Sequence, residues 1–172
     1  MNPTQPPRRL SELPSGSTVC ADANILVYHF TQVEPLSKAN TTFLERGLRE
    51  QIRIVTTPQM VSDVVHRVMM LEARLRFQVP PRKLVGYLKQ YPDAVRQLTG
   101  HLDIPGLLCR FKVDICPLTH IHLHEATRFR RDYGLMANDS LLLGLIVTER
   151  IQHLASNDHD FRRVPDVTLW VP

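Results

Sequence analysis

The sequence predicts an α/β fold with three layers, α/β/α, in which helices cover both faces of a central, mostly parallel sheet. Short runs of β-branched and apolar residues alternate with segments of helical hydrophobic period, which is typical of β–α units. One helix, expected over Ala137–Ile151, is apolar nearly all round and should be buried. A chain of 172 residues that is 43% apolar can bury the core that one such domain needs.

Residues 1–17 differ from the rest of the chain, because they contain four prolines and few large apolar side chains. We expect a flexible leader over 1–17 and a single domain over 18–172. Pro58 suits a helix start, and Val61–Leu75 keep a helical period until Pro80-Pro81. The first half of the domain is therefore predicted to contain strand Thr18–Ala21, helix Ile25–Phe30, a helix from Pro35 to about Gln51, strand Arg53–Thr57 and a long helix from Pro58.

The second half of the chain continues the alternation. Gly134 provides a stop for the helix that precedes it. His120, His122 and His124 alternate at the start of a helical pattern, where their side chains diverge, so we do not expect a metal site there. The predicted elements are helix Arg82–Gln90, a short helix within 92–108 with a loop around Pro105-Gly106, strand Phe111–Cys116, helix Thr119–Tyr133, helix Ala137–Ile151, and strands within Ile151–Ser156 and Val167–Val171.

Composition narrows the possible function classes. A net charge of +4 and recurring arginine pairs suit a polyanionic partner, although charge alone favours a mildly basic, solvated surface. The three cysteines include no C-x-x-C pair, which argues against a disulfide framework or a zinc site. No nucleotide-binding glycine motif is present. No apolar stretch has bilayer length and the N-terminus has no signal-peptide core, so we expect a cytoplasmic protein without membrane contact.

Four aspartates occupy positions where a solvated carboxylate is not expected. Asp22 and Asp158 each follow a predicted strand, and ligands of open parallel sheets bind beyond the carboxyl ends of the strands. Asp139 lies in the first turn of the apolar helix, and Asp63 borders the buried face of the long helix. Each one alone has a structural explanation, such as a turn or a helix dipole. Together they favour a shared site.

A cluster of carboxylates favours a bound cation, because several close negative charges cannot all ionise without compensation. Mg²⁺ or Mn²⁺ prefers oxygen ligands and stabilises charge that develops on a phosphoryl group. An acidic centre in a basic chain suits a metal-dependent nuclease, since the basic rim can hold a phosphate backbone. The predicted catalytic and metal-binding residues are Asp22, Asp63, Asp139 and Asp158.

The order of the segments that contain Asp22, Asp63, Asp139 and Asp158 resembles that of PIN-domain ribonucleases. The closing strand, Val167–Pro172, is also similar, so the resemblance spans nearly the whole chain after residue 17. Each motif alone has little specificity, but four in the right order and spacing are fairly specific. The segments that carry the resemblance are Val19–Leu26, Thr56–Arg67, Tyr133–Leu142 and Leu154–Phe161.

The resemblance implies a Mg²⁺- or Mn²⁺-dependent endoribonuclease that hydrolyses RNA. Size and simplicity are closest to VapC-type toxins of toxin–antitoxin pairs, which implies a small antitoxin protein as inhibitor and a homodimer. By match to the motifs, the four aspartates bind the metal, supported by Asn24, Ser156, Asn138 and Asp160. The family usually has Glu in place of Asp63, and the shorter side chain puts direct ligation by Asp63 in question.

Two other functions fit the same residues. One is a PIN-like nuclease of RNA processing that has no antitoxin. The other is a non-catalytic module that binds RNA or protein, in which the acidic pocket receives an arginine from a partner. The sequence does not indicate which RNA would be recognised, because recognition depends on loops and surface charge.

Overall fold

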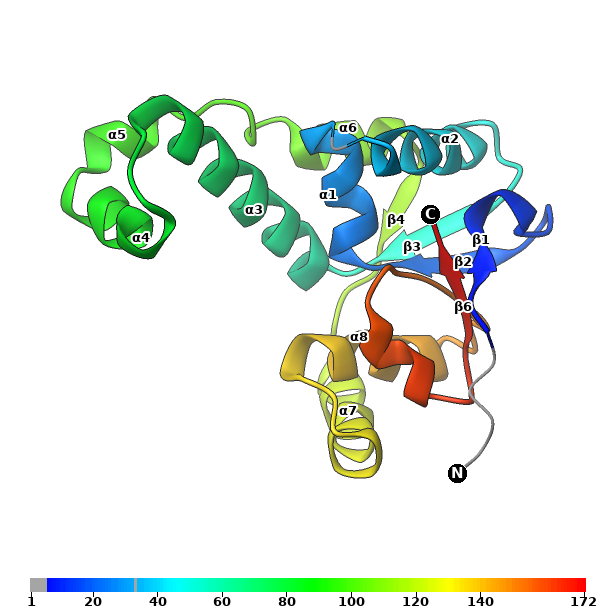
Figure 1. The fold of residues 1–172 in the computed structure, drawn as a ribbon. Coiled ribbons are helices and arrows are strands. Elements are labelled where there is room, and N and C mark those ends of the chain that lie inside the picture. The colour runs from blue at the N-terminus through cyan, green and yellow to red at the C-terminus, as the bar shows by residue number, and fades with distance from the viewer. Residues whose placement is uncertain (1–5, 33) are drawn as a thin grey trace.

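The fold is built on one six-stranded sheet, seen in a computed structural model that describes residues 6–32 and 34–172 (Figure 1). The strands lie in the order β1-β6-β5-β2-β3-β4. Every pair is parallel, which confirms the predicted, mostly parallel sheet. The strands are β1 (Arg8–Arg9), β2 (Thr18–Ala21), β3 (Arg53–Thr56), β4 (Val113–Ile115), β5 (His153–Ala155) and β6 (Thr168–Val171).

Strand β2 lies where the chain changes its direction across the sheet. From β2 the chain proceeds to β3 and β4 on one side, and it later places β5 and β6 on the other side. Cys20 of β2 is in register with Val55 of β3 and with Leu154 of β5. The carboxyl ends of β2 and β5 therefore form a topological switch point, which is where open α/β sheets bind their ligands.

Helices cover both faces of the sheet, which confirms the three-layer arrangement (Figure 1). No helix among the described residues is long and apolar enough to cross a membrane. The layer on one face contains α1 (Ala23–Thr31), α2 (Leu36–Leu48), the first part of α3 (Pro58–Phe77) and α6 (Ile104–Arg110). The layer on the other contains α7 (His120–Tyr133), α8 (Ala137–Thr148) and the 3₁₀ helix η2 (His159–Arg163).

Helices α7 and α8 approach each other closely. A Cβ added to Gly144 of α8 would lie 2.4 Å from the carbonyl oxygen of His122 in α7, so only glycine allows this approach. His122 is buried, and its Nδ1 accepts a hydrogen bond from the Thr119 backbone N–H at 2.8 Å. His122 therefore caps the start of α7, in agreement with the expectation that the histidines mark a helix start.

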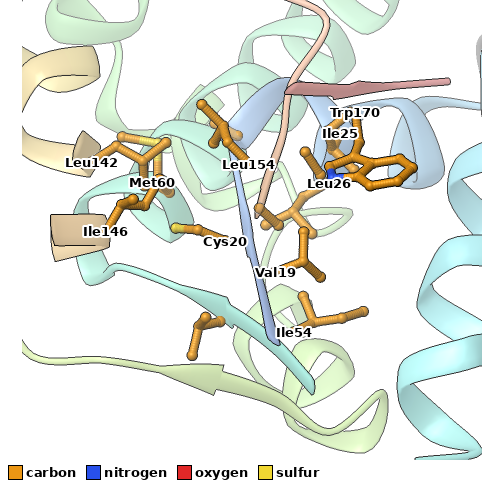
Figure 2. Close-up of a cluster of buried hydrophobic side chains, with 14 of the residues drawn as sticks. Val19, Cys20, Ile25, Leu26, Ile54, Met60, Leu142, Ile146, Leu154 and Trp170 are labelled. Carbon is orange, nitrogen blue, oxygen red and sulfur yellow. The ribbon is translucent and has the colours of Figure 1, made fainter. Parts of the chain in front are cut away.

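The main core fills the space between the sheet and the helix layers (Figure 2). Helix α8 is buried along Leu142–Ile146, as its apolar sequence predicts. The side chains that meet in this core come from strands on both sides of the switch point and from α1, α3 and α8: Val19, Cys20, Ile25, Leu26, Ile54, Met60, Leu142, Ile146, Leu154 and Trp170.

Helix α3 continues beyond the sheet and carries a second, smaller core at its far end (Figure 1). Helices α4 (Pro81–Gln90) and α5 (Pro92–Arg96) pack against it there. The buried members of this cluster are Ala73, Leu84, Leu88, Ala94 and Leu98. The first turns of α3 stay at the switch point, and its last turns belong to a separate packing unit.

Two regions differ from the sequence expectations. The loop predicted around Pro105-Gly106 was wrong, because Pro105 occupies the first turn of α6, where its missing N–H removes no helical hydrogen bond. Residues 1–5 of the expected leader lie outside the described residues, but Arg8–Arg9 pair with β6 and Leu10 and Leu13 are buried. These two leucines supply apolar anchors, so residues 8–13 pack against the domain.

Candidate metal centre

The candidate site lies at the switch point, where Asp22 directly follows β2. The Asp22 backbone N–H donates to the carbonyl oxygen of Ala155, the last residue of β5, at 3.0 Å. This bond continues the ladder between β2 and β5 by one residue. Asp22 is then the residue that precedes α1, and the residue is only 8% exposed. The ends of two parallel strands thus hold this carboxylate in place.

Ser156 and Asn24 share one oxygen of the Asp22 carboxylate. The Ser156 hydroxyl donates to Asp22 Oδ2 at 2.6 Å, and Asn24 Nδ2 donates to the same atom at 2.6 Å. Asn24 Nδ2 also lies 3.1 Å from Ser156 Oγ, which can accept a hydrogen bond because its own proton is donated to Asp22. The three side chains form one network that fixes the orientation of Asp22.

The segment after β5 is held by backbone donors. The N–H of Asn157 donates to Asn24 Oδ1 at 3.1 Å, and the N–H of Asp158 donates to Ser156 Oγ at 3.0 Å. The N–H of Asp160 donates to Asp158 Oδ1 at 2.8 Å and so starts η2. These bonds bring Asp158 and Asp160 to the same edge of the sheet as Asp22.

Burial raises the pKa of Asp22 above its ordinary value, because it desolvates the charged carboxylate. The hydrogen bond from Ser156 and the positive charge of Arg67 favour the ionised form and lower this pKa. The negative charge of Asp158 acts in the opposite direction. Burial and Asp158 therefore oppose ionisation of Asp22, whereas Ser156 and Arg67 favour it.

Asp139, in the first turn of α8, lies near the same edge. Its pKa is raised from 3.8 to about 6, first by burial and then by the negative charges of Asp22, Asp158 and Asp160. The charge of Arg67 lowers it in part. Because three other carboxylates raise its pKa, Asp139 lies in a region of concentrated negative charge.

Asp63 and Asn138 connect α3 to α8. Asn138 Nδ2 donates to Asp63 Oδ2 at 3.0 Å, and Gln59 Nε2 lies 3.4 Å from Asp63 Oδ1. Asn138 is the neighbour of Asp139, so Asp63 lies close to the acidic group in space. Its carboxylate accepts hydrogen bonds from these two amides, which connect it to Asn138 of α8 and to Gln59 of α3.

The chemistry of these residues fits a hard divalent cation. The candidate donors are carboxylate oxygens, which Mg²⁺ and Mn²⁺ prefer, and a cation would relieve the repulsion that raises the pKa of Asp139. Over residues 6–32 and 34–172, no three side chains of His, Cys, Asp or Glu lie close enough to bind one ion. Hydrogen bonds direct the carboxylates of Asp22 and Asp63 to Ser156, Asn24 and Asn138.

Sequence reasoning missed two residues at this site. Arg67 acts electrostatically on both Asp22 and Asp139, and helical spacing could have revealed it, because Arg67 is one turn after Asp63 in α3. The Tyr28 hydroxyl lies 3.3 Å from Asn157 Nδ2. No sequence signal indicates this contact, because the two residues are 129 positions apart.

Most of the chain matches a known protein family. Residues 19–167 match the family model of the PIN domain. No curated protein matches the chain. A chain of the VapBC2 complex of Rickettsia felis, solved bound to a DNA fragment from its promoter, is similar with 17% identity and a TM-score of 0.57, covering 90% of this chain and 98% of that one. A chain of a toxin–antitoxin complex from Klebsiella pneumoniae has 18% identity and a TM-score of 0.46, with 87% and 94% covered.

Proposed function

We propose that the chain is a divalent-metal-dependent endoribonuclease, because it belongs to the PIN domain family of nucleases. One observation carries the proposal: at the switch point of the sheet, burial and then the negative charges of Asp22, Asp158 and Asp160 raise the pKa of Asp139 to about 6. A fold without a use for cations would gain stability by avoiding such repulsion. The basic charge of the remaining chain suits a polyanionic substrate.

Asp22, Asp139 and Asp158 are the proposed ligands of Mg²⁺ or Mn²⁺, with Asp63 completing the group. When bound, the metal would stabilise charge on the scissile phosphate and lower the pKa of a water molecule. Ser156 and Asn24 would orient the Asp22 carboxylate through the hydrogen bonds described above, and the bond from Ser156 also favours its ionised form. These residues act before any substrate arrives, because they orient the carboxylate in advance.

Asn138, Asp160 and Asp63 have supporting roles in this proposal. Asn138 positions the Asp63 carboxylate through its 3.0 Å hydrogen bond. Asp160 forms an ion pair with Arg163 and adds negative charge near Asp139. Asp63 is one methylene shorter than the glutamate that is usual in the family, so its proposed contribution is indirect, through water.

The test is cleavage of an RNA pool by purified protein with Mg²⁺, with Mn²⁺ and with EDTA. We expect metal-dependent cleavage, and a fall of at least a hundredfold, roughly, in Asp139→Asn and Asp22→Asn, because each removes charge that holds the metal. Asp93→Asn is a matched control, since Asp93 is an exposed aspartate of α5. Cleavage that persists in both site variants, or that resists EDTA, would refute the proposal.

We further propose that this nuclease is a toxin of the VapC type that acts in the cytoplasm as a homodimer. The sequence motifs support this role, and the R. felis VapBC2 chain has a similar fold. Expression of the chain alone should arrest growth, and Asp139→Asn should remove the arrest. A small protein encoded beside it should suppress the toxicity. If the wild-type chain cleaves RNA but is harmless when expressed, an RNA-processing nuclease without an antitoxin is the better assignment.

A further inference from the structure

Arg67 is an exposed cation beside the acidic group of the switch point. It lies in α3, four residues after Asp63, so both side chains lie on one face of that helix. The Asp63 carboxylate on this face meets Asn138 of α8, which places the first turns of α3 against the start of α8. Arg67 is one turn further out along the same face.

The helix face that carries Arg67 lies beside a proposed metal ligand. Asn138 and Asp139 are adjacent in the first turn of α8, so the hydrogen bond between Asn138 and Asp63 brings this part of α3 next to Asp139. Among the described residues, however, Arg67 forms no ion pair within 4.0 Å and no side-chain hydrogen bond. The guanidinium is therefore close to the site but has all its donors available.

A guanidinium in this setting suits a phosphate. Its planar donors match two oxygens of a phosphate at once, and it keeps its charge at every physiological pH. If Arg67 served only to neutralise the carboxylates, an ion pair with one of them would be expected, and none of the ion pairs in residues 6–32 and 34–172 includes Arg67. An exposed position at the rim leaves room for a strand of nucleic acid to approach.

We propose that Arg67 binds a backbone phosphate of the RNA strand beside the carboxylates and so positions the strand for cleavage. This inference rests on the proposed nuclease function and names the residue that holds the substrate at that site. Arg67 is a substrate-positioning residue here, and its contact is to the phosphate backbone, so it carries no preference for base sequence.

The test measures binding of a labelled single-stranded RNA in an Asp139→Asn background, which keeps the RNA intact. Arg67→Gln should weaken binding roughly tenfold, as expected for the loss of one charge-assisted contact. It should also reduce the slope of log affinity against log salt by about 0.7, the value for one phosphate contact on a single strand. Arg67→Lys should keep the slope and lose part of the affinity, because it keeps the charge without the planar fork.

Arg74→Gln is the matched control, because Arg74 is exposed on the same face of α3, two turns further from the site. It should leave both affinity and salt slope almost unchanged. In the otherwise wild-type enzyme, Arg67→Gln should raise KM more than it lowers kcat. Circular dichroism and thermal unfolding check that each variant is folded. If Arg67→Gln does not fold, the binding and salt dependence of Arg67→Lys test the inference instead.

Three results would overturn the inference. An unchanged salt slope in Arg67→Gln would show that Arg67 does not contact phosphate. An equal loss in Arg74→Gln would assign the effect to general surface charge. A loss of folding in both Arg67 variants would assign Arg67 to stability. If the chain cleaves RNA and Arg67→Gln has no effect, only this inference fails, whereas a chain that neither binds nor cleaves RNA refutes the nuclease proposal as well.

Discussion

Replacing Asp139 by Asn should make the metal-free protein more stable near neutral pH. The change removes one negative charge from a group of four and preserves the shape of the side chain. The pKa of Asp139 is about 6 in the fold instead of the ordinary 3.8, because of burial and of the charges of Asp22, Asp158 and Asp160. Ionisation of Asp139 therefore works against folding.

The magnitude follows from that difference in pKa. A gap between 3.8 and about 6 corresponds to ~3 kcal/mol as an upper bound. Asp139 is only partly buried, so solvent screens much of the repulsion, and we expect a gain of ~1 kcal/mol. For a domain of this size, that gain corresponds to a rise of roughly 2–4 °C in Tm.

The stability gained by Asp139→Asn should depend on pH, because it reflects the ionisation of Asp139. The folded-state pKa of Asp139 is above the unfolded value, so the folded protein takes up a proton first as the pH falls from neutral. The penalty is complete above about pH 6, shrinks as the pH falls, and vanishes below about pH 4. The advantage of Asp139→Asn over wild type should therefore decrease by about half between pH 7.5 and pH 5.

Thermal unfolding in EDTA, followed by circular dichroism at both pH values, measures this effect. Asp93→Asn is the control for loss of one aspartate, since Asp93 forms an exposed ion pair with Arg96 and its removal should change stability little. Excess Mg²⁺ should raise the Tm of wild type and leave Asp139→Asn nearly unchanged. A variant no more stable than wild type at neutral pH would refute the argument that burial and neighbouring negative charge oppose the ionisation of Asp139.

Three further predictions concern other parts of the fold. Gly144→Ala should lower the free energy of unfolding in urea by ~1–3 kcal/mol, because its Cβ would meet the backbone of α7. Gly86→Ala is the control and should raise it by ~0.5–1 kcal/mol, because nothing lies within 4 Å of that Cβ. A Gly144→Ala variant as stable as wild type would contradict the close approach of α7 and α8. Ser156→Ala should lose ~1–3 kcal/mol near neutral pH. Because the Ser156 hydrogen bond lowers the pKa of Asp22, this loss should shrink on acidification, and thermal unfolding that shows an equal loss at low pH would exclude the mechanism. Asp63→Glu should retain or raise kcat/KM for RNA while Asp63→Asn lowers it; an inactive Asp63→Glu would remove Asp63 from the site.

Local hydrophobic patterns account for the parts of the fold that the sequence could predict. The β-branched run predicted as a strand over Arg53–Thr57 forms β3 over Arg53–Thr56. The apolar helix predicted over Ala137–Ile151 forms α8, which ends at Thr148. The Pro105-Gly106 pair was misread, because proline favours a loop and a first helical turn equally. Strand β1 was missed, since its two arginines carry no apolar pattern and pair only at a sheet edge.

In the candidate site, too, some features follow from the order of the elements and others depend on contacts between distant residues. The positions of Asp22 and Asp158 after strands were readable from the chain, because they depend on the order of the elements. The hydrogen bond from Ser156 to Asp22 joins residues 134 positions apart, and it exists only because β5 lies beside β2. Helical spacing from Asp63 could have indicated Arg67, but the hydrogen bond that brings α3 to α8 joins Asp63 and Asn138, which are 75 positions apart.

The place of β5 beside β2 also sets the time at which the candidate site can be completed during synthesis of the chain. Asp22 emerges from the ribosome early, but Ser156 and Asp158, which complete its surroundings, emerge only after most of the chain has been made. An elongating chain therefore has its first two strands long before it has the edge at which the carboxylates gather. Under the proposed endoribonuclease function, this order would keep the unfinished chain from cutting the message that encodes it.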